Sequence, residues 1–146
     1  MEKSKTQKVP AARSPEIPKY GRKFHVNKGV VVELYAPLAY LAVPYSHKDP
    51  TVMATRFNQV NVVAASLMKK GITLFSPISQ NHPVALAGGL PVEWEYWEKF
   101  GRNFLACCHT LYVLKLDGWK ESVGVQAEIK IATDMGLDII YLDPIL

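Results

Sequence analysis

The sequence has little that is typical of exported or membrane proteins. Its 146 residues contain no stretch near the roughly 18 apolar residues of a membrane-spanning helix. No early segment has the apolar run of about 7 to 15 residues found in signal peptides. We therefore expect a cytoplasmic protein that does not bind a membrane.

Cysteine is scarce, and the sequence motif typical of dinucleotide-binding sites is missing. Cys107 and Cys108 are adjacent, which is a poor geometry for a mutual disulfide, and no metal-ligand spacing surrounds them. We expect both to be core thiols and predict no metal site. A Gly-x-Gly-x-x-Gly motif is also missing, so a dinucleotide cofactor is not indicated and no cofactor is predicted.

Positive charge is scarce outside the N-terminal segment. Residues 1–28 hold eight Lys or Arg against two Glu, whereas the remainder holds nine against eleven acidic residues, so the formal net charge of +4 divides into +6 and −2. Because the basic character is confined to this segment, nucleic acid is an improbable partner for the folded domain. Its composition predicts a disordered basic arm at 1–28, either a solubilising tail or a docking arm for acidic partners, and a folded domain at 29–146.

Strand-like and helix-like segments alternate along the rest of the chain. Short buried strands are expected near residues 39–43, 72–75, 111–116 and 138–142. The pattern predicts an α/β fold, a Rossmann-like three-layer sandwich with a mostly parallel sheet of four or five strands. In this arrangement the Tyr40 strand lies between the Thr73 and Val113 strands. The run from 29 to 35 is predicted as an edge strand.

Capping residues mark the predicted helices. Asp49 and Pro50 open one that runs to Gly71, and a second runs from about Glu121 to the stop at Gly136. Residues 92–100 and 102–109 are also read as helix. By contrast, residues 76–83 are predicted to be a polar loop held by a hydrogen bond from its histidine, and residues 85–91 a mobile connection.

Polar and small residues follow the strands at their carboxyl ends, where open α/β sheets bind ligands. The segment of Pro44, Tyr45 and Ser46 follows the first core strand and leads to a helix N-terminus that suits an anion, with Arg56 nearby. Ser76 and His82 follow the second core strand. The third is followed by Asp117, Gly118, Trp119, Ser122 and Gly124.

Four motifs combine in this order. They are Tyr-Leu-Ala-x-Pro-Tyr-Ser at 40–46, Ser-Pro-x-Ser at 76–79 with His-Pro at 82–83, a Trp-rich run at 94–97, and Gly-Trp-x-x-Ser-x-Gly-Val-x-x-Glu at 118–128. The combination resembles the nucleoside 2-deoxyribosyltransferase-like superfamily, which includes the deoxynucleoside monophosphate N-glycosidases, and more closely a bacterial and phage branch of it. The likeness covers roughly Ala39 to the C-terminus.

The resemblance implies a function and roles for residues. It implies N-glycosidic bond cleavage or deoxyribosyl transfer on a nucleoside or nucleoside monophosphate, with Glu128 as the nucleophile and Tyr40 in contact with it. Ser122 and Gly124 are implied to hold the 5′ hydroxyl or phosphate. The remaining candidates for substrate binding are Pro44, Tyr45, Ser46, Arg56, Ser76, His82, Gly118 and Trp119.

One departure from the superfamily pattern leaves two functions open. The Asp that usually protonates the leaving base is matched here by Gly101, and Glu98 or His82 is the nearest substitute. Because general acid catalysis contributes roughly 10²- to 10⁴-fold, the alternative to an enzyme is a catalytically weak nucleotide-binding module that senses or sequesters its ligand.

An aromatic run, Trp94, Tyr96 and Trp97, lies among glutamates. It suits the core, a subunit interface or a wall on which a base stacks. So much apolar surface is unfavourable in water, so we expect a homo-oligomer with this segment at or beside the interface.

Overall fold

A short hairpin precedes the main domain. The computed structural model describes residues 24–33 and 37–144, so most of the predicted basic arm lies outside it. Within the first range β1 (Phe24–Asn27) and β2 (Val30–Glu33) pair antiparallel in a sheet of their own. Lys28 and Gly29 join them with positive φ at both positions, which suits a two-residue hairpin turn. The predicted edge strand was therefore wrong, because β2 pairs with β1 and not with the main sheet. The predicted division between arm and domain at residue 29 stays a prediction.

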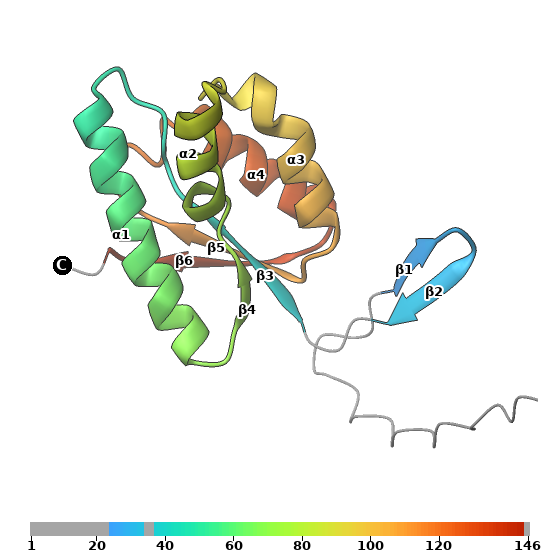
Figure 1. The fold of residues 1–146 in the computed structure, drawn as a ribbon. Coiled ribbons are helices and arrows are strands. Elements are labelled where there is room, and N and C mark those ends of the chain that lie inside the picture. Colours follow the sequence, from blue (N-terminus) through green and yellow to red (C-terminus); the bar gives the residue numbers. More distant parts are fainter. Residues whose placement is uncertain (1–23, 34–36, 145–146) are drawn as a thin grey trace, which may run out of the picture.

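Four parallel strands form the main sheet, in the order β4-β3-β5-β6 (Figure 1). They are β3 (Leu38–Ala42), β4 (Thr73–Phe75), β5 (Thr110–Leu114) and β6 (Asp138–Leu142). Tyr40 in β3 is level with Phe75 on one side and Leu111 on the other. The predicted α/β class, parallel sheet and central position of the Tyr40 strand are confirmed.

Two of the helices begin where the capping residues predicted. Asp49 caps α1 (Pro50–Lys69) by accepting a hydrogen bond from the amide of Thr51, and Ser122 caps α4 (Val123–Asp134). The aromatic run opens α3 (Trp94–Ala106). None of the helices in the described ranges is long and apolar enough to span a membrane.

Helix α2 (Pro77–Gly88) corrects the predicted loop at 76–83 and much of the mobile connection after it. Ser76 occupies its N-cap position, Pro77 lies in its first turn, and Gly89 ends it in the left-handed conformation. The segment was misread because Pro83, inside the helix, cannot donate a backbone hydrogen bond and usually interrupts helices. His82 is therefore a buried helix residue rather than a loop residue.

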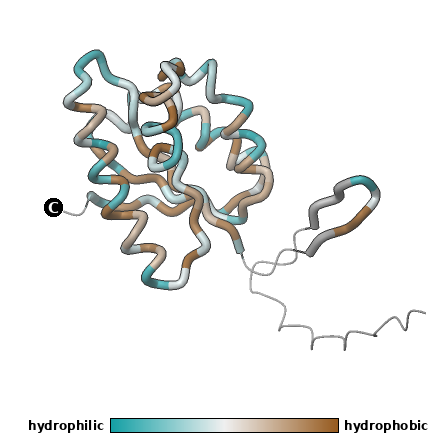
Figure 2. Tube along the Cα trace, viewed as in Figure 1, coloured by the Kyte–Doolittle hydropathy of each residue, from teal (hydrophilic) through white to brown (hydrophobic). Residues whose placement is uncertain are grey.

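Alternate side chains of β3 enter two separate cores. Tyr40 and Ala42 pack with residues of α3, α4 and β5, whereas Leu41 and Val43 pack with α1. This period of two, with both faces covered, is the signature of a parallel sheet between helix layers. Hydrophobic residues concentrate along the sheet strands, and hydrophilic ones on many of the outer helix turns (Figure 2). Cys108 belongs to the first core, as predicted, while Cys107 is only partly buried.

Candidate active site

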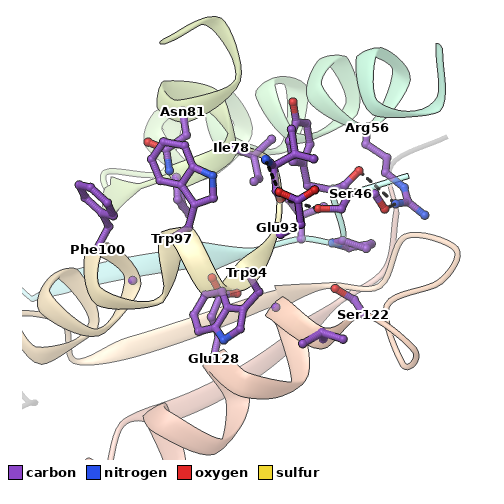
Figure 3. A pocket seen from close by; sticks show the side chains of 18 of the residues that line it. Ser46, Arg56, Ile78, Asn81, Glu93, Trp94, Trp97, Phe100, Ser122 and Glu128 are labelled. Carbon is purple, nitrogen blue, oxygen red and sulfur yellow. Dashed lines mark hydrogen bonds between the residues drawn. The ribbon is translucent and has the colours of Figure 1, made fainter. Parts of the chain in front are cut away.

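A cavity of about 560 Å³ opens where β3 and β5 end and α2, α3 and α4 approach one another (Figure 3). The chain leaves β3 and β5 toward opposite sides of the sheet, and this is the place where open α/β sheets bind ligands. The volume lies in the range of small-molecule sites, roughly 300 to 1,000 Å³. Of the residues predicted from sequence, those that line it are Tyr40, Pro44, Tyr45, Ser46, Arg56, Gly118, Ser122, Gly124 and Glu128.

Glu128 and Tyr40 form a buried pair in the cavity wall. Their side chains come from α4 and β3, and the Tyr40 hydroxyl donates to Glu128 Oε1 at 2.8 Å. Glu128 is 7% exposed and Tyr40 is 1% exposed, and both residues line the cavity. The structure thus brings together two residues 88 positions apart in sequence, in the contact that the resemblance implied.

Burial controls the protonation of this pair. It raises the pKa of the Glu128 carboxyl from its ordinary value of 4.5 to about 8, and the hydrogen bond from Tyr40 opposes the rise. Burial, followed by the nearby Glu128 charge, also raises the pKa of Tyr40 well above its ordinary 10. At neutral pH the Tyr40 hydroxyl therefore keeps its proton, and the Glu128 carboxyl is mostly protonated.

Arg56 links the two loops at the polar end of the cavity. Its guanidinium donates to the carbonyls of Tyr45 and Ser46 after β3, at 3.2 and 3.1 Å, and to the carbonyl of Asp117 after β5, at 3.1 Å. Gly118 allows this approach, because its φ is +87° and a Cβ there would lie 3.1 Å from the Arg56 guanidinium. Arg56 therefore holds the site together, in addition to lining it.

The first helix N-terminus does not offer the open anion site that the sequence suggested. The Asp49 carboxylate occupies it, accepting from the amide of Thr51 at 2.9 Å and from its hydroxyl at 2.8 Å. These hydrogen bonds lower the pKa of Asp49, which keeps the carboxylate charged. Nearby, the Ser46 hydroxyl donates to the carbonyl of Val92 at 2.6 Å, which ties the β3 loop to the segment before α3.

Three predicted binding residues do not line the cavity. His82 stacks on Phe57 and is hydrogen bonded to the Tyr45 hydroxyl, so it positions a lining residue instead. Ser76 pairs with the Ser79 hydroxyl at 2.7 Å. Trp119 packs against the core beside Tyr141. These side chains support the fold around the site.

Part of the aromatic run at 94–97 lines the cavity. Trp94, Trp97 and Phe100 form an apolar side, opposite the polar side of Ser46, Arg56 and Ser122 (Figure 3). Glu93, Glu95 and Glu121 also line the cavity and were not among the predicted residues. Glu93 and Glu95 flank Trp94 and Glu121 precedes the Ser122 cap, but these positions do not reveal which side chains face a ligand.

The domain that carries this cavity matches a known family. The model of the family described as Domain of unknown function (DUF1937) matches residues 38–143. The chain belongs to this family. The match begins at the first residue of β3 and ends just after β6, so the DUF1937 domain contains the sheet and the whole cavity, while the β1–β2 hairpin lies outside it. A comparison with curated proteins finds no match.

Neither substitute acid considered for Gly101 lies in the cavity of this DUF1937 domain. Glu98 is paired with Arg102 at 2.9 Å on the outer side of α3, and His82 faces Tyr45 and Phe57. At Gly101 a Cβ would lie 3.2 Å from the Trp94 ring and 3.3 Å from the Tyr40 hydroxyl. The Trp94 ring thus occupies the space into which a side chain at 101 would extend.

Replacing Gly101 with alanine should destabilise the DUF1937 domain by about 1–2 kcal/mol, because the added methyl group overpacks against Trp94 and the buried Tyr40. Gly88→Ala is the matched control. A Cβ at this helical glycine meets only Leu90 at 3.6 Å, so this variant should be neutral or slightly more stable. Urea unfolding of both variants measures the difference, and equal stabilities would show that Trp94 yields easily.

Proposed function

We propose that the domain cleaves the N-glycosidic bond of a nucleoside or nucleoside monophosphate, by hydrolysis or by deoxyribosyl transfer. The observation that carries this proposal is the buried Glu128 carboxyl, held by Tyr40 at 2.8 Å in the wall of a ligand-sized cavity. The order of the motifs, which resembles the nucleoside 2-deoxyribosyltransferase-like superfamily, supports the same assignment.

In the proposed reaction the Glu128 carboxylate attacks the anomeric carbon. The bond from that carbon to the base nitrogen breaks, its electron pair leaves with the base, and the base takes up a proton from a neighbouring acid or water. The resulting glycosyl ester is then attacked by water or by a second base, which releases the carboxylate. Tyr40 donates to Glu128 Oε1 throughout, which orients the carboxyl group.

The pKa of Glu128 is compatible with nucleophilic attack by its carboxylate when a substrate is bound. With a pKa of about 8, roughly one carboxyl in ten is ionised at pH 7. Positive charge that develops on the sugar in the transition state stabilises the ionised form. A poorly solvated carboxylate is also a stronger nucleophile than one surrounded by water.

The two sides of the cavity suit the two parts of a nucleoside. Trp94, Trp97 and Phe100 offer ring faces and edges to a base, where stacking contributes about 1–3 kcal/mol. The polar side offers the Ser122 hydroxyl and the N-terminus of α4 to the 5′ end of the sugar. This orientation directs the anomeric carbon toward the region between them.

A second candidate function rests on Gly101. With a glycine at this position and Glu98 outside the cavity, the leaving base lacks the superfamily's usual proton donor. The alternative is a module that binds a nucleotide and senses or sequesters it, with little or no turnover.

We also propose a cytoplasmic homo-oligomer. Tyr96, Phe100 and Phe104 on α3 remain 38%, 37% and 40% exposed, and a second copy of the chain would cover them. The apolar side of the cavity lies on this helix, so assembly would also shield the cavity from water.

The proposal predicts that the protein releases free base from at least one member of a panel of ribo- and deoxyribonucleosides and their 5′-monophosphates. Chromatography after incubation, with and without a second base as acceptor, measures hydrolysis and transfer separately. Tight binding without any released base would favour the binding module, and absence of both would reject the two functions together.

A further inference from the structure

We propose that the cavity selects the uncharged nucleoside and discriminates against its 5′-monophosphate. This inference rests on the proposed function and narrows its substrate class. It comes from the charges that line the cavity and from the groups to which its cationic and polar residues are already hydrogen bonded.

The lining residues carry more negative than positive charge. Arg56 is the cation among them, whereas Glu93, Glu95 and Glu121 are carboxylates, in addition to the buried Glu128. A phosphate monoester brings a further charge of about −1.5 to −2 at pH 7. Like charges facing each other across the cavity oppose binding, and because Glu93, Glu95 and Glu121 are exposed, salt screens this repulsion.

Arg56 keeps its positive charge, but part of its capacity to donate hydrogen bonds is already used. It donates three hydrogen bonds to the carbonyls of Tyr45, Ser46 and Asp117, at 3.1 to 3.2 Å. These bonds use the end-on face of the guanidinium, Nη1 and Nη2, so a phosphate could take that face only by displacing some of them and separating the two loops. Burial, which lowers the pKa of Arg56, adds to the cost of holding its charge.

The N-terminus of α1 is also unavailable to a phosphate. The Asp49 carboxylate accepts from the amide and hydroxyl of Thr51, so the first turn of α1 already faces an anion of the chain itself. The Ser46 hydroxyl donates to the Val92 carbonyl at 2.6 Å, and the Val92 amide in turn donates to Glu93 Oε2 at 3.1 Å. The part of the cavity beside Ser46 and Val92 therefore presents the Glu93 carboxylate to a ligand. A phosphate site would present hydrogen-bond donors there.

The N-terminus of α4 is the remaining candidate for contact with the 5′ end of the ligand. It suits a hydroxyl better than a phosphate dianion. The Ser122 oxygen accepts from the amide of Val125 at 3.3 Å, which leaves its own O–H to donate. Glu121 precedes it in the chain and also lines the cavity. A neutral 5′-hydroxyl can accept from Ser122 and donate to Glu121, whereas a phosphate can only accept and meets the carboxylate charge.

The test compares each of the four 2′-deoxynucleosides with its own 5′-monophosphate, by calorimetric titration of the full chain and by base release. For the base that binds best, the Kd of the monophosphate should be at least about tenfold higher than that of the nucleoside at low salt. The ratio should shrink as ionic strength rises from about 0.01 M to about 1 M, because salt screens the repulsion.

Two variants and a control assign the discrimination to the lining carboxylates. Glu93→Gln and Glu121→Gln should each narrow the ratio of the two Kd values severalfold. Glu98→Gln removes a carboxylate from the outer side of α3 and should leave the ratio as in the wild type. A ratio that responds equally to all three variants would show that net charge, rather than the cavity, is responsible, and would overturn the assignment.

The outcomes separate this inference from the proposed function. Equal or tighter binding of the monophosphate, together with base release, overturns the inference and leaves the glycosidase intact. A protein that neither binds nor cleaves any member of the set overturns both.

Discussion

Replacing Glu128 with glutamine should abolish base release, lowering kcat by a factor on the order of 10³ or more, while nucleoside affinity stays within a few-fold. Glutamine keeps the shape of the side chain and can still accept the hydrogen bond from Tyr40. It cannot supply a carboxylate to the anomeric carbon, and this interaction belongs to the transition state. Single-turnover base release and calorimetric titration measure the two effects separately.

The matched control for this experiment is Glu98→Gln. It makes the same replacement of a carboxyl by an amide at a solvent-accessible glutamate whose partner is Arg102, one turn away on α3. Surface pairs of this kind contribute little to stability, so the control should fold and turn over as the wild type does. Equal rates for wild type and Glu128→Gln would reject Glu128 as the nucleophile.

Stability should fall steeply between about pH 5 and pH 8 in the wild type and much less steeply in Glu128→Gln. The pKa of Glu128 is about 8 in the folded state against an ordinary value of 4.5, so the folded chain holds a proton that the unfolded chain releases. Stability is therefore greatest below the ordinary pKa and is lost as pH rises through the folded one. At about 1.4 kcal/mol for each pH unit, the upper bound on this loss is about 5 kcal/mol.

Urea unfolding at a series of pH values measures this dependence. All other ionisable groups are common to the two proteins, so the difference between their curves isolates Glu128. Glu128→Gln should be the more stable protein at pH 8 and above, where the wild type must hold a buried charge. Parallel curves would show that the carboxyl is well solvated in the folded state.

The fold could be predicted from sequence to the extent that local signals were strong. Apolar runs near Tyr40 and Val113, with Asp49–Pro50 and Gly136 as helix boundaries, were enough to place the sheet and two of the helices. The N-terminal hairpin was misplaced because a run of valines does not reveal its pairing partner. Helix α2 was missed because Pro83 removes a backbone donor, a local penalty that packing against α1 and β3 offsets.

The candidate site, like the fold, could be predicted from sequence only in part. The contact between Tyr40 and Glu128 was expected only through the motifs, since nothing in the spacing of residues 88 apart indicates that they touch. Arg56 was placed near the ligand, but its three carbonyl partners follow from the path of two loops that the sequence does not specify. The lining glutamates were missed because charged residues at or just before a helix start are usually solvated.

The link that Arg56 makes between the two loops has a consequence for how a ligand binds. The segments after β3 and β5 cannot separate without breaking hydrogen bonds to Tyr45, Ser46 or Asp117. Ordering mobile segments on association reduces affinity, and a site shaped in advance avoids that entropic penalty. The polar end of the cavity is preorganised, so tight binding there does not require a ligand that makes many contacts.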